Sequence, residues 1–123
     1  MRFLCLVNLD KEEAAKLAEA DWRVIDRDSL AYDDTLEKRG SYIVSMALQG
    51  PETARTVRIR QGRALVTDDP FVETKEHVAG FILIEAETIE EAVEIAKGIP
   101  LARIGSIEVR GQMMIQRPGP DEA

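Results

Sequence analysis

Short apolar runs of strand-forming residues alternate with segments of helical periodicity along most of this chain. The first run, residues 3–7, is unbroken, as expected for a central strand that is covered on both faces. Asp10 and Glu13 then have the spacing of a helix N-terminus, and apolar residues recur at helical spacing from Ala14 to Ile25. A strand followed directly by an amphipathic helix predicts a layered fold of helices on a sheet.

The helical pattern is interrupted once before it ends. Residues 26–29, Asp-Arg-Asp-Ser, break the apolar stripe, and residues 30–40 have the pattern of a second helical piece that stops at Gly40. The sequence leaves open whether the two pieces form one kinked helix.

The middle of the chain predicts three strands. Residues 41–48 carry enough large apolar side chains to favour a largely buried strand. Residues 56–60 and 63–67 are two short strand patterns joined by Gln61 and Gly62, and a glycine in such a two-residue connection tolerates positive φ. These two strands are therefore expected to form a β-hairpin.

The strongest helix signal follows another apolar strand, residues 80–84. Thr88 and Glu91 have the spacing of a capping box, which predicts a helix over residues 88–97. Its buried face is expected to consist of Ile89, Ala92, Val93 and Ala96.

The C-terminal part predicts one more strand over residues 106–109, with an extension to Ile115 left open. Residues 117–123 contain two prolines and a glycine and no periodic apolar residue, so a disordered tail is expected there. The chain is accordingly predicted to be a single domain over residues 1–116.

The expected order of elements is strand, helix, strand, hairpin, strand, helix, strand. This order predicts the α+β class, specifically a ferredoxin-like split βαβ sandwich with an inserted β-hairpin. The helices can cover only one face of such a sheet, and a common way to bury the other apolar face is to pack it against a second copy. A homodimer is therefore expected.

Charge and composition limit the partners and the location. The net charge of −7 at pH 7 opposes binding to nucleic acid and to anionic membranes. No apolar run approaches the roughly 20 residues that span a bilayer, and the opening residues lack a signal-peptide pattern, so a cytoplasmic protein is expected. The single cysteine, Cys5, lies in an apolar strand and is expected to be an inert buried thiol.

The usual motifs of cofactor sites are missing from the sequence. It has no paired His or Cys ligands, no glycine-rich phosphate loop with its lysine and no serine elbow. No cofactor and no metal site are predicted.

Two residues after the hairpin are candidates for proton transfer. Asp68 could act as a base or a ligand contact, or only hydrogen-bond the backbone of a turn. His77 is the only imidazole and could exchange protons near neutral pH, although its charged surroundings favour an exposed residue without a catalytic role. As a pair they suggest a small-molecule isomerase or lyase; the alternative is a non-catalytic ligand-binding or interaction protein.

Other charged side chains are candidates for ligand binding. Glu73 and Lys75 could bind a ligand, bridge subunits or remain solvated. Arg58 and Arg60 share one face of the hairpin and could clamp a small anionic or polar ligand, or could keep an exposed edge from aggregating.

Three stretches of the sequence carry a family resemblance. They are Val66 to His77 followed by Gly80-Phe81, Leu48 to Ala54 with Thr56-Val57-Arg58, and the C-terminal stretch with Ile99-Pro100, Ala102-Arg103 and Gly105 to Arg110. In these stretches the chain resembles the DGPF branch of the YCII-related proteins. Asp69 departs from the pattern, because the motif that names the branch has glycine there.

The resemblance implies a ferredoxin-like fold assembled as a dimeric α+β barrel, a superfamily that includes small-molecule isomerases, monooxygenases and dehalogenating lyases. Activity proposed for the family rests on a His and an Asp lining a cleft, but the first helical region here contains no histidine. Arg103 is a ligand-binding candidate by resemblance only. Members of the DGPF branch are often encoded beside sigma factors, which implies a regulatory alternative in signalling or stress.

Overall fold

The structure is a computed structural model that describes residues 1–68 and 75–119. Its elements in chain order are β1 (Arg2–Asp10), α1 (Lys11–Ala15), α2 (Glu19–Lys38), β2 (Tyr42–Ala47), the 3-10 turn η1 (Pro51–Thr53), β3 (Thr56–Arg60), β4 (Arg63–Thr67), β5 (Glu76–Glu85), α3 (Ile89–Lys97), the 3-10 turn η2 (Pro100–Arg103) and β6 (Gly105–Gly111).

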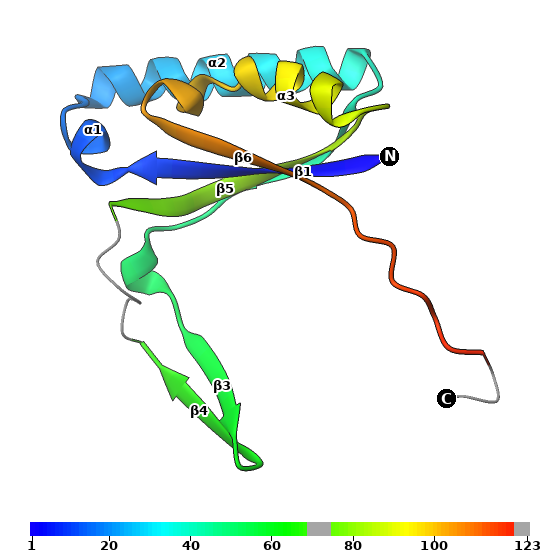
Figure 1. Cartoon of the computed structure of the whole chain (residues 1–123). Coiled ribbons are helices and arrows are strands. Elements are labelled where there is room, and N and C mark those ends of the chain that lie inside the picture. Colours follow the sequence, from blue (N-terminus) through cyan, green and yellow to red (C-terminus); the bar gives the residue numbers. More distant parts are fainter. Residues whose placement is uncertain (69–74, 120–123) are drawn as a thin grey trace.

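Four strands form the main sheet in the order β2-β5-β1-β6, and all neighbouring strands are antiparallel. Helices α2 and α3 lie side by side on one face of this sheet (Figure 1). The strand order and the two helical crossovers are those of the ferredoxin-like split βαβ plan, so the predicted fold class is confirmed. Strands β3 and β4 form a separate two-stranded sheet inserted between β2 and β5.

The core lies between the sheet and the helices. Alternate residues of β1 point to it, and Phe3, Cys5 and Val7 are at most 4% exposed. Burial raises the pKa of the Cys5 thiol to about 11, which keeps it protonated and inert as expected. The residues between them, Leu4 and Leu6, point to the opposite face and are only partly buried in the single chain. The expectation that this strand is covered on both faces therefore does not hold for one chain alone.

The helical region between β1 and β2 breaks at a different point from the predicted one. Helix α1 ends in a tight turn in which the Leu17 amide donates to the Ala14 carbonyl, and α2 starts where the Asp21 carboxylate accepts from the Ala18 amide at 2.8 Å. Residues 26–29, where an interruption was predicted, lie inside α2. Their charges are tolerated because they are at the helix surface, where Arg27 pairs with Asp28.

Strand β2 is an edge strand and not the largely buried strand that was predicted. Its side chains Val44 and Met46 are 43% and 55% exposed. They pair with Leu83 and Phe81 on the sheet face that no helix covers. An apolar pattern indicates that a strand tends to be buried, but it does not show whether the residues that pack on it belong to the same chain.

Helix α3 has the predicted boundaries and cap but a different buried face. The Thr88 hydroxyl accepts from the Glu91 amide at 3.1 Å, as a capping box requires. The buried residues are Ala92, Ile95 and Ala96, whereas Val93 is 39% exposed. Ala92 and Ala96 are buried as predicted, but Ile89 and Val93 are not, because these two apolar residues lie on the solvent side of the stripe.

Strand β6 ends at Gly111, and the possible extension to Ile115 does not form. Its partner strand β1 begins at Arg2, and the Gln112 amide donates to the Arg2 carbonyl in the last contact between the two segments. Residues 113–119 continue past the start of β1 and are not in a strand. Met113, Met114 and Ile115 are 78–80% exposed, and residues 120–123 of the predicted tail lie outside the described residues.

The predicted hairpin is confirmed. Gln61 and Gly62 have φ values of 53° and 74°, the positive values that a tight two-residue hairpin turn requires. The hairpin extends away from the helices, as does the C-terminal segment (Figure 1). Its side chains Val57, Ile59 and Val66 are each about 60% exposed. An isolated two-stranded hairpin of this kind is marginally stable in water.

Candidate functional site

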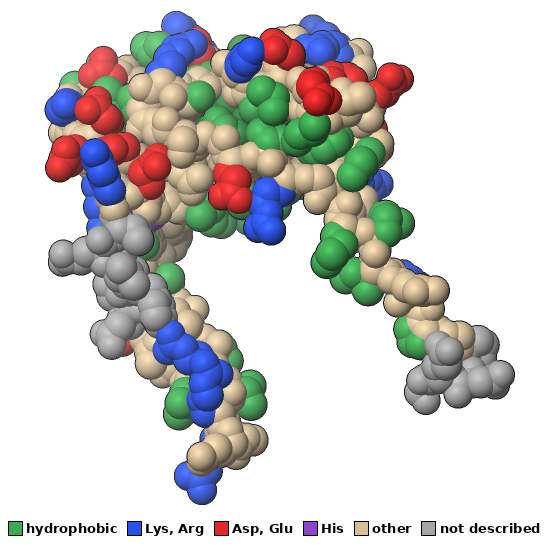
Figure 2. Space-filling model, in the orientation of Figure 1, with side chains coloured by type: hydrophobic (Ala, Val, Ile, Leu, Met, Phe, Trp, Pro, Cys, Tyr) green, Lys and Arg blue, Asp and Glu red, His purple; other side chains and the backbone are tan. Residues whose placement is uncertain are grey.

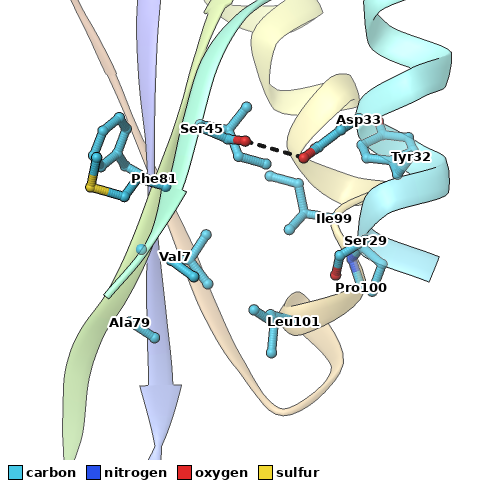
Figure 3. Close-up of a pocket in the computed structure, with 14 residues that line it drawn as sticks. Val7, Ser29, Tyr32, Asp33, Ser45, Ala79, Phe81, Ile99, Pro100 and Leu101 are labelled. Atoms are coloured by element: carbon cyan, nitrogen blue, oxygen red, sulfur yellow. Dashed lines mark hydrogen bonds between the residues drawn. The ribbon is translucent and has the colours of Figure 1, made fainter. Parts of the chain in front are cut away.

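A pocket lies between α2, the helix-covered face of the sheet and η2 (Figure 3). Its cavity volume is about 110 Å³. The described residues that line it are Val7, Ser29, Tyr32, Asp33, Ser45, Met46, Ala47, Ala79, Gly80, Phe81, Ile82, Ile99, Pro100 and Leu101. Most of these are apolar, and Asp33 is the only carboxylate among them. The pocket is thus an apolar cavity with one acidic group.

Helical spacing places Asp33 at this pocket. Ser29, Tyr32, Asp33 and Leu36 are separated by three or four residues and therefore lie on the same face of α2, which packs toward the sheet. Leu36 is fully buried and fixes this face against the core. Asp33 is consequently half-buried at the pocket, whereas its neighbour Asp34 is exposed.

A bulge in β2 supplies the hydrogen-bond partner of Asp33. The register of β2 against β5 shifts between Tyr42 and Val44, so that Tyr42 pairs with Ile84 and Ser45 with Ile82, both on the helix-covered face. Regular alternation would have put Tyr42 and Ser45 on opposite faces.

The bulge allows a chain of three polar side chains. The Ser45 hydroxyl donates to Asp33 Oδ2 at 3.1 Å, and Ser45 Oγ lies 2.7 Å from Tyr42 Oη. Since serine has only one hydroxyl hydrogen, this arrangement has Tyr42 donating to Ser45 and Ser45 donating to Asp33. The chain fixes the position of the carboxylate at the pocket wall.

Burial raises the pKa of Asp33, and the neighbouring Asp34 charge raises it further, while the hydrogen bond from Ser45 partly opposes both effects. Burial also raises the pKa of Tyr32, whose hydroxyl donates to the Ile95 carbonyl. The Tyr32 phenol is therefore neutral and already hydrogen-bonded, which leaves Asp33 as the main polar group for a ligand.

The proton-transfer candidates from the sequence lie elsewhere. Asp68 is exposed at the end of β4. His77 is half-buried on β5, where its Nδ1 is buried and has no hydrogen-bond partner among the described residues. It lines an open hollow with Lys11, Pro51 and Glu52. Among the described residues no hydrogen bond joins Asp68 to His77. A joint role for the two stays a prediction.

The predicted ligand-binding residues are spread over the surface. Arg58 is half-buried on β3, Lys75 is exposed before β5, and Glu73 lies outside the described residues. Arg103 is exposed in η2, and one of its guanidinium nitrogens lies 3.8 Å from Asp28 on α2. Arg58, Lys75 and Arg103 do not line the Asp33 pocket, and the ligand-binding role of all four residues stays a prediction.

Sequence reasoning missed Asp33 and Ser45. The sequence does contain a sign of this site: Asp33 has helical spacing to Ser29 and Leu36, which places a charged residue on the helix face that packs on the sheet. Within residues 1–68 and 75–119 no group of three His, Cys, Asp or Glu side chains is close enough to hold a metal ion. The same part of the chain contains no helix with the length and apolarity to span a membrane.

Comparison with known proteins points to one family. Residues 1–113 match the family model of the YCII-related domain. The chain is also 35% identical over 103 residues to an uncharacterised protein of Rhizobium meliloti (strain 1021), and the alignment covers 82% of each chain.

Proposed function

The chain belongs to the YCII-related family, and from this premise we propose that it is a small-molecule-binding protein whose ligand occupies the Asp33 pocket. The observation that carries the proposal is a preformed apolar cavity with one carboxylate fixed at its wall by Ser45. Ligand sites of proteins are commonly built in this way, from apolar walls and a few placed polar groups. The stretch from Val66 to His77 supports placing the chain in the DGPF branch.

Between catalysis and binding, the pocket favours binding without catalysis. Proton transfer in an isomerase or lyase commonly uses a base together with a second group that donates or stabilises charge. The described lining residues include no histidine, lysine, arginine or second carboxylate. A role in ligand-dependent regulation is consistent with such a site.

A single-base isomerase or lyase is the second candidate, supported by the raised pKa of Asp33 and by the Tyr42-Ser45-Asp33 chain. The two candidates differ in a measurable way. A fragment screen by NMR is expected to yield compounds that shift the amide signals of α2, β2 and η2. Under the binding proposal these compounds are recovered unchanged after prolonged incubation, whereas their conversion would establish the enzyme.

The replacement Asp33→Asn is expected to leave the melting temperature at pH 7 unchanged or slightly higher. The folded state raises the pKa of Asp33 above its ordinary value of 3.8, so its protonated form favours folding below pH 3.8 and this contribution is lost as pH rises through the folded pKa. Asparagine keeps the size and the hydrogen bond from Ser45 without the charge.

The advantage of the asparagine variant should disappear below pH 3.8, where Asp33 itself is protonated. Thermal melts between pH 3 and pH 8 test this, with Asp26→Asn on the exposed surface of α2 as the control. A large loss of stability at pH 7 would instead make Asp33 a structural residue.

We also propose that the protein acts as a homodimer in the cytoplasm. The sheet face opposite the helices presents Leu4, Leu6, Val44, Met46, Phe81 and Leu83, as the strand registers show. The hairpin and the C-terminal segment extend from the same side and carry exposed apolar residues (Figures 1 and 2). A second copy packed on this face would bury all three surfaces. The buried, unpaired Cys5 suits a reducing compartment.

A further inference from the structure

We propose that the ligand of the Asp33 pocket is a small primary amine, bound as its ammonium ion and carrying a compact apolar body. This inference rests on the proposed function, because it assigns the chemical class of the ligand to the same pocket. The small anionic or polar ligand expected from the sequence concerned the arginines of the hairpin, which do not line this pocket.

The charge of the pocket selects a cation. Asp33 is the only charged side chain among its described lining residues, and no lysine or arginine there neutralises it. A carboxylate or phosphate would bring a second negative charge into an apolar space, which is strongly unfavourable. An ammonium group would pair with Asp33 and compensate for the loss of water around both charges. The net charge of −7 further favours the approach of a cation.

The free hydrogen-bonding capacity of the site also fits an ammonium group. Asp33 Oδ2 accepts from Ser45, whereas Oδ1 accepts no hydrogen bond from the residues that the structure describes. Ser29 lies one helical turn earlier on the same face of α2 and lines the same cavity. An ammonium group has three N–H donors, enough for both Oδ1 and the Ser29 oxygen.

The walls and the volume limit the rest of the ligand. Side chains of Val7, Ile99 and Leu101 face the cavity between the sheet and the helices (Figure 3). The volume of about 110 Å³ is somewhat below that of an apolar protein cavity of about 150 Å³ that accepts benzene. A hydrocarbon group of about four or five carbon atoms therefore fits beside the ammonium group.

The test uses one carbon skeleton with three head groups and one larger skeleton. Cyclopentylamine, cyclopentanol, cyclopentanecarboxylate and 1-adamantylamine are titrated into the ¹⁵N-labelled protein at pH 7 and constant ionic strength. Cyclopentylamine is expected to bind at least tenfold more tightly than cyclopentanol and to shift the signals of α2, β2 and η2. The carboxylate and the larger amine are expected to cause no shift there.

Asp33→Asn is expected to weaken the binding of cyclopentylamine at least tenfold and to leave the binding of cyclopentanol within about twofold, since only the amine depends on the charge. Equal affinity of the amine and the alcohol, or preferential binding of the carboxylate, would overturn the amine assignment while leaving the pocket as a ligand site. If none of the compounds shifts these signals, the pocket proposal falls as well. The titration of the parent protein decides these outcomes even if the variant does not fold.

Discussion

Replacing Ile95 by alanine is expected to lower the free energy of unfolding by about 2–5 kcal/mol. Ile95 is 2% exposed and belongs to the core cluster between α3 and the sheet, together with Ile84 and Ile99. Truncation removes buried methyl groups and leaves a cavity that its close-packed neighbours fill only in part. Urea denaturation followed by circular dichroism measures the loss.

Val93→Ala is the matched control on the same helix. Val93 is 39% exposed, so its truncation is expected to cost about 1 kcal/mol or less. Both variants are compared with the parent at one protein concentration, because a dimer makes stability depend on concentration. Equal losses for the two variants would contradict the buried face that the structure gives to α3.

The order and type of most elements could be predicted because they depend on local signals. The turn at Gln61 and Gly62 requires residues that tolerate positive φ, and the start of α3 requires the capping contact between Thr88 and Glu91. These interactions join residues that are close in the sequence, so a pattern in the sequence is enough to locate them. The strand order follows because few topologies connect such elements without crossing.

The break between α1 and α2 and the buried face of α3 could not be predicted in the same way. The break depends on the Asp21 side chain. Its carboxylate accepts from the amide of Ala18, the residue before α2 begins at Glu19. The buried face of α3 depends on how the helix is rotated on the sheet, and Val93 and Ile95 are both apolar. Tertiary packing decides between such alternatives.

The candidate site was not predicted because it depends on strand register. Ser45 reaches Asp33 only because the bulge at Ile43 turns it to the helix-covered face. Simple alternation along residues 41–48 would place Ser45 on the opposite face from Tyr42 and away from α2. Asp68 and His77 were predicted from residue type and family resemblance. Neither criterion contains information on strand register.

Leu6→Asp is expected to convert a dimeric protein into a monomer. Leu6 is in β1 in the middle of the main sheet, beside Phe81 of β5 and Glu108 of β6, on the face without helices. In a dimer packed through this face, each copy would place an unpaired carboxylate in the interface. Because such burial costs several kcal/mol and each 1.4 kcal/mol changes an equilibrium tenfold, dimerisation should weaken by about 100-fold or more.

Leu30→Asp is the matched control, since Leu30 is 67% exposed and belongs to α2, which covers the other face of the sheet (Figure 1). Size-exclusion chromatography with light scattering gives the mass of the parent and of both variants, and circular dichroism shows whether each is folded. The parent and Leu30→Asp are expected to have twice the chain mass of 13.7 kDa, and folded Leu6→Asp the mass of one chain. A monomeric parent would contradict the proposed dimer. A dimeric Leu6→Asp variant would show that the interface is not the sheet face, and would favour an interface formed by the exposed apolar residues of the hairpin and the C-terminal segment.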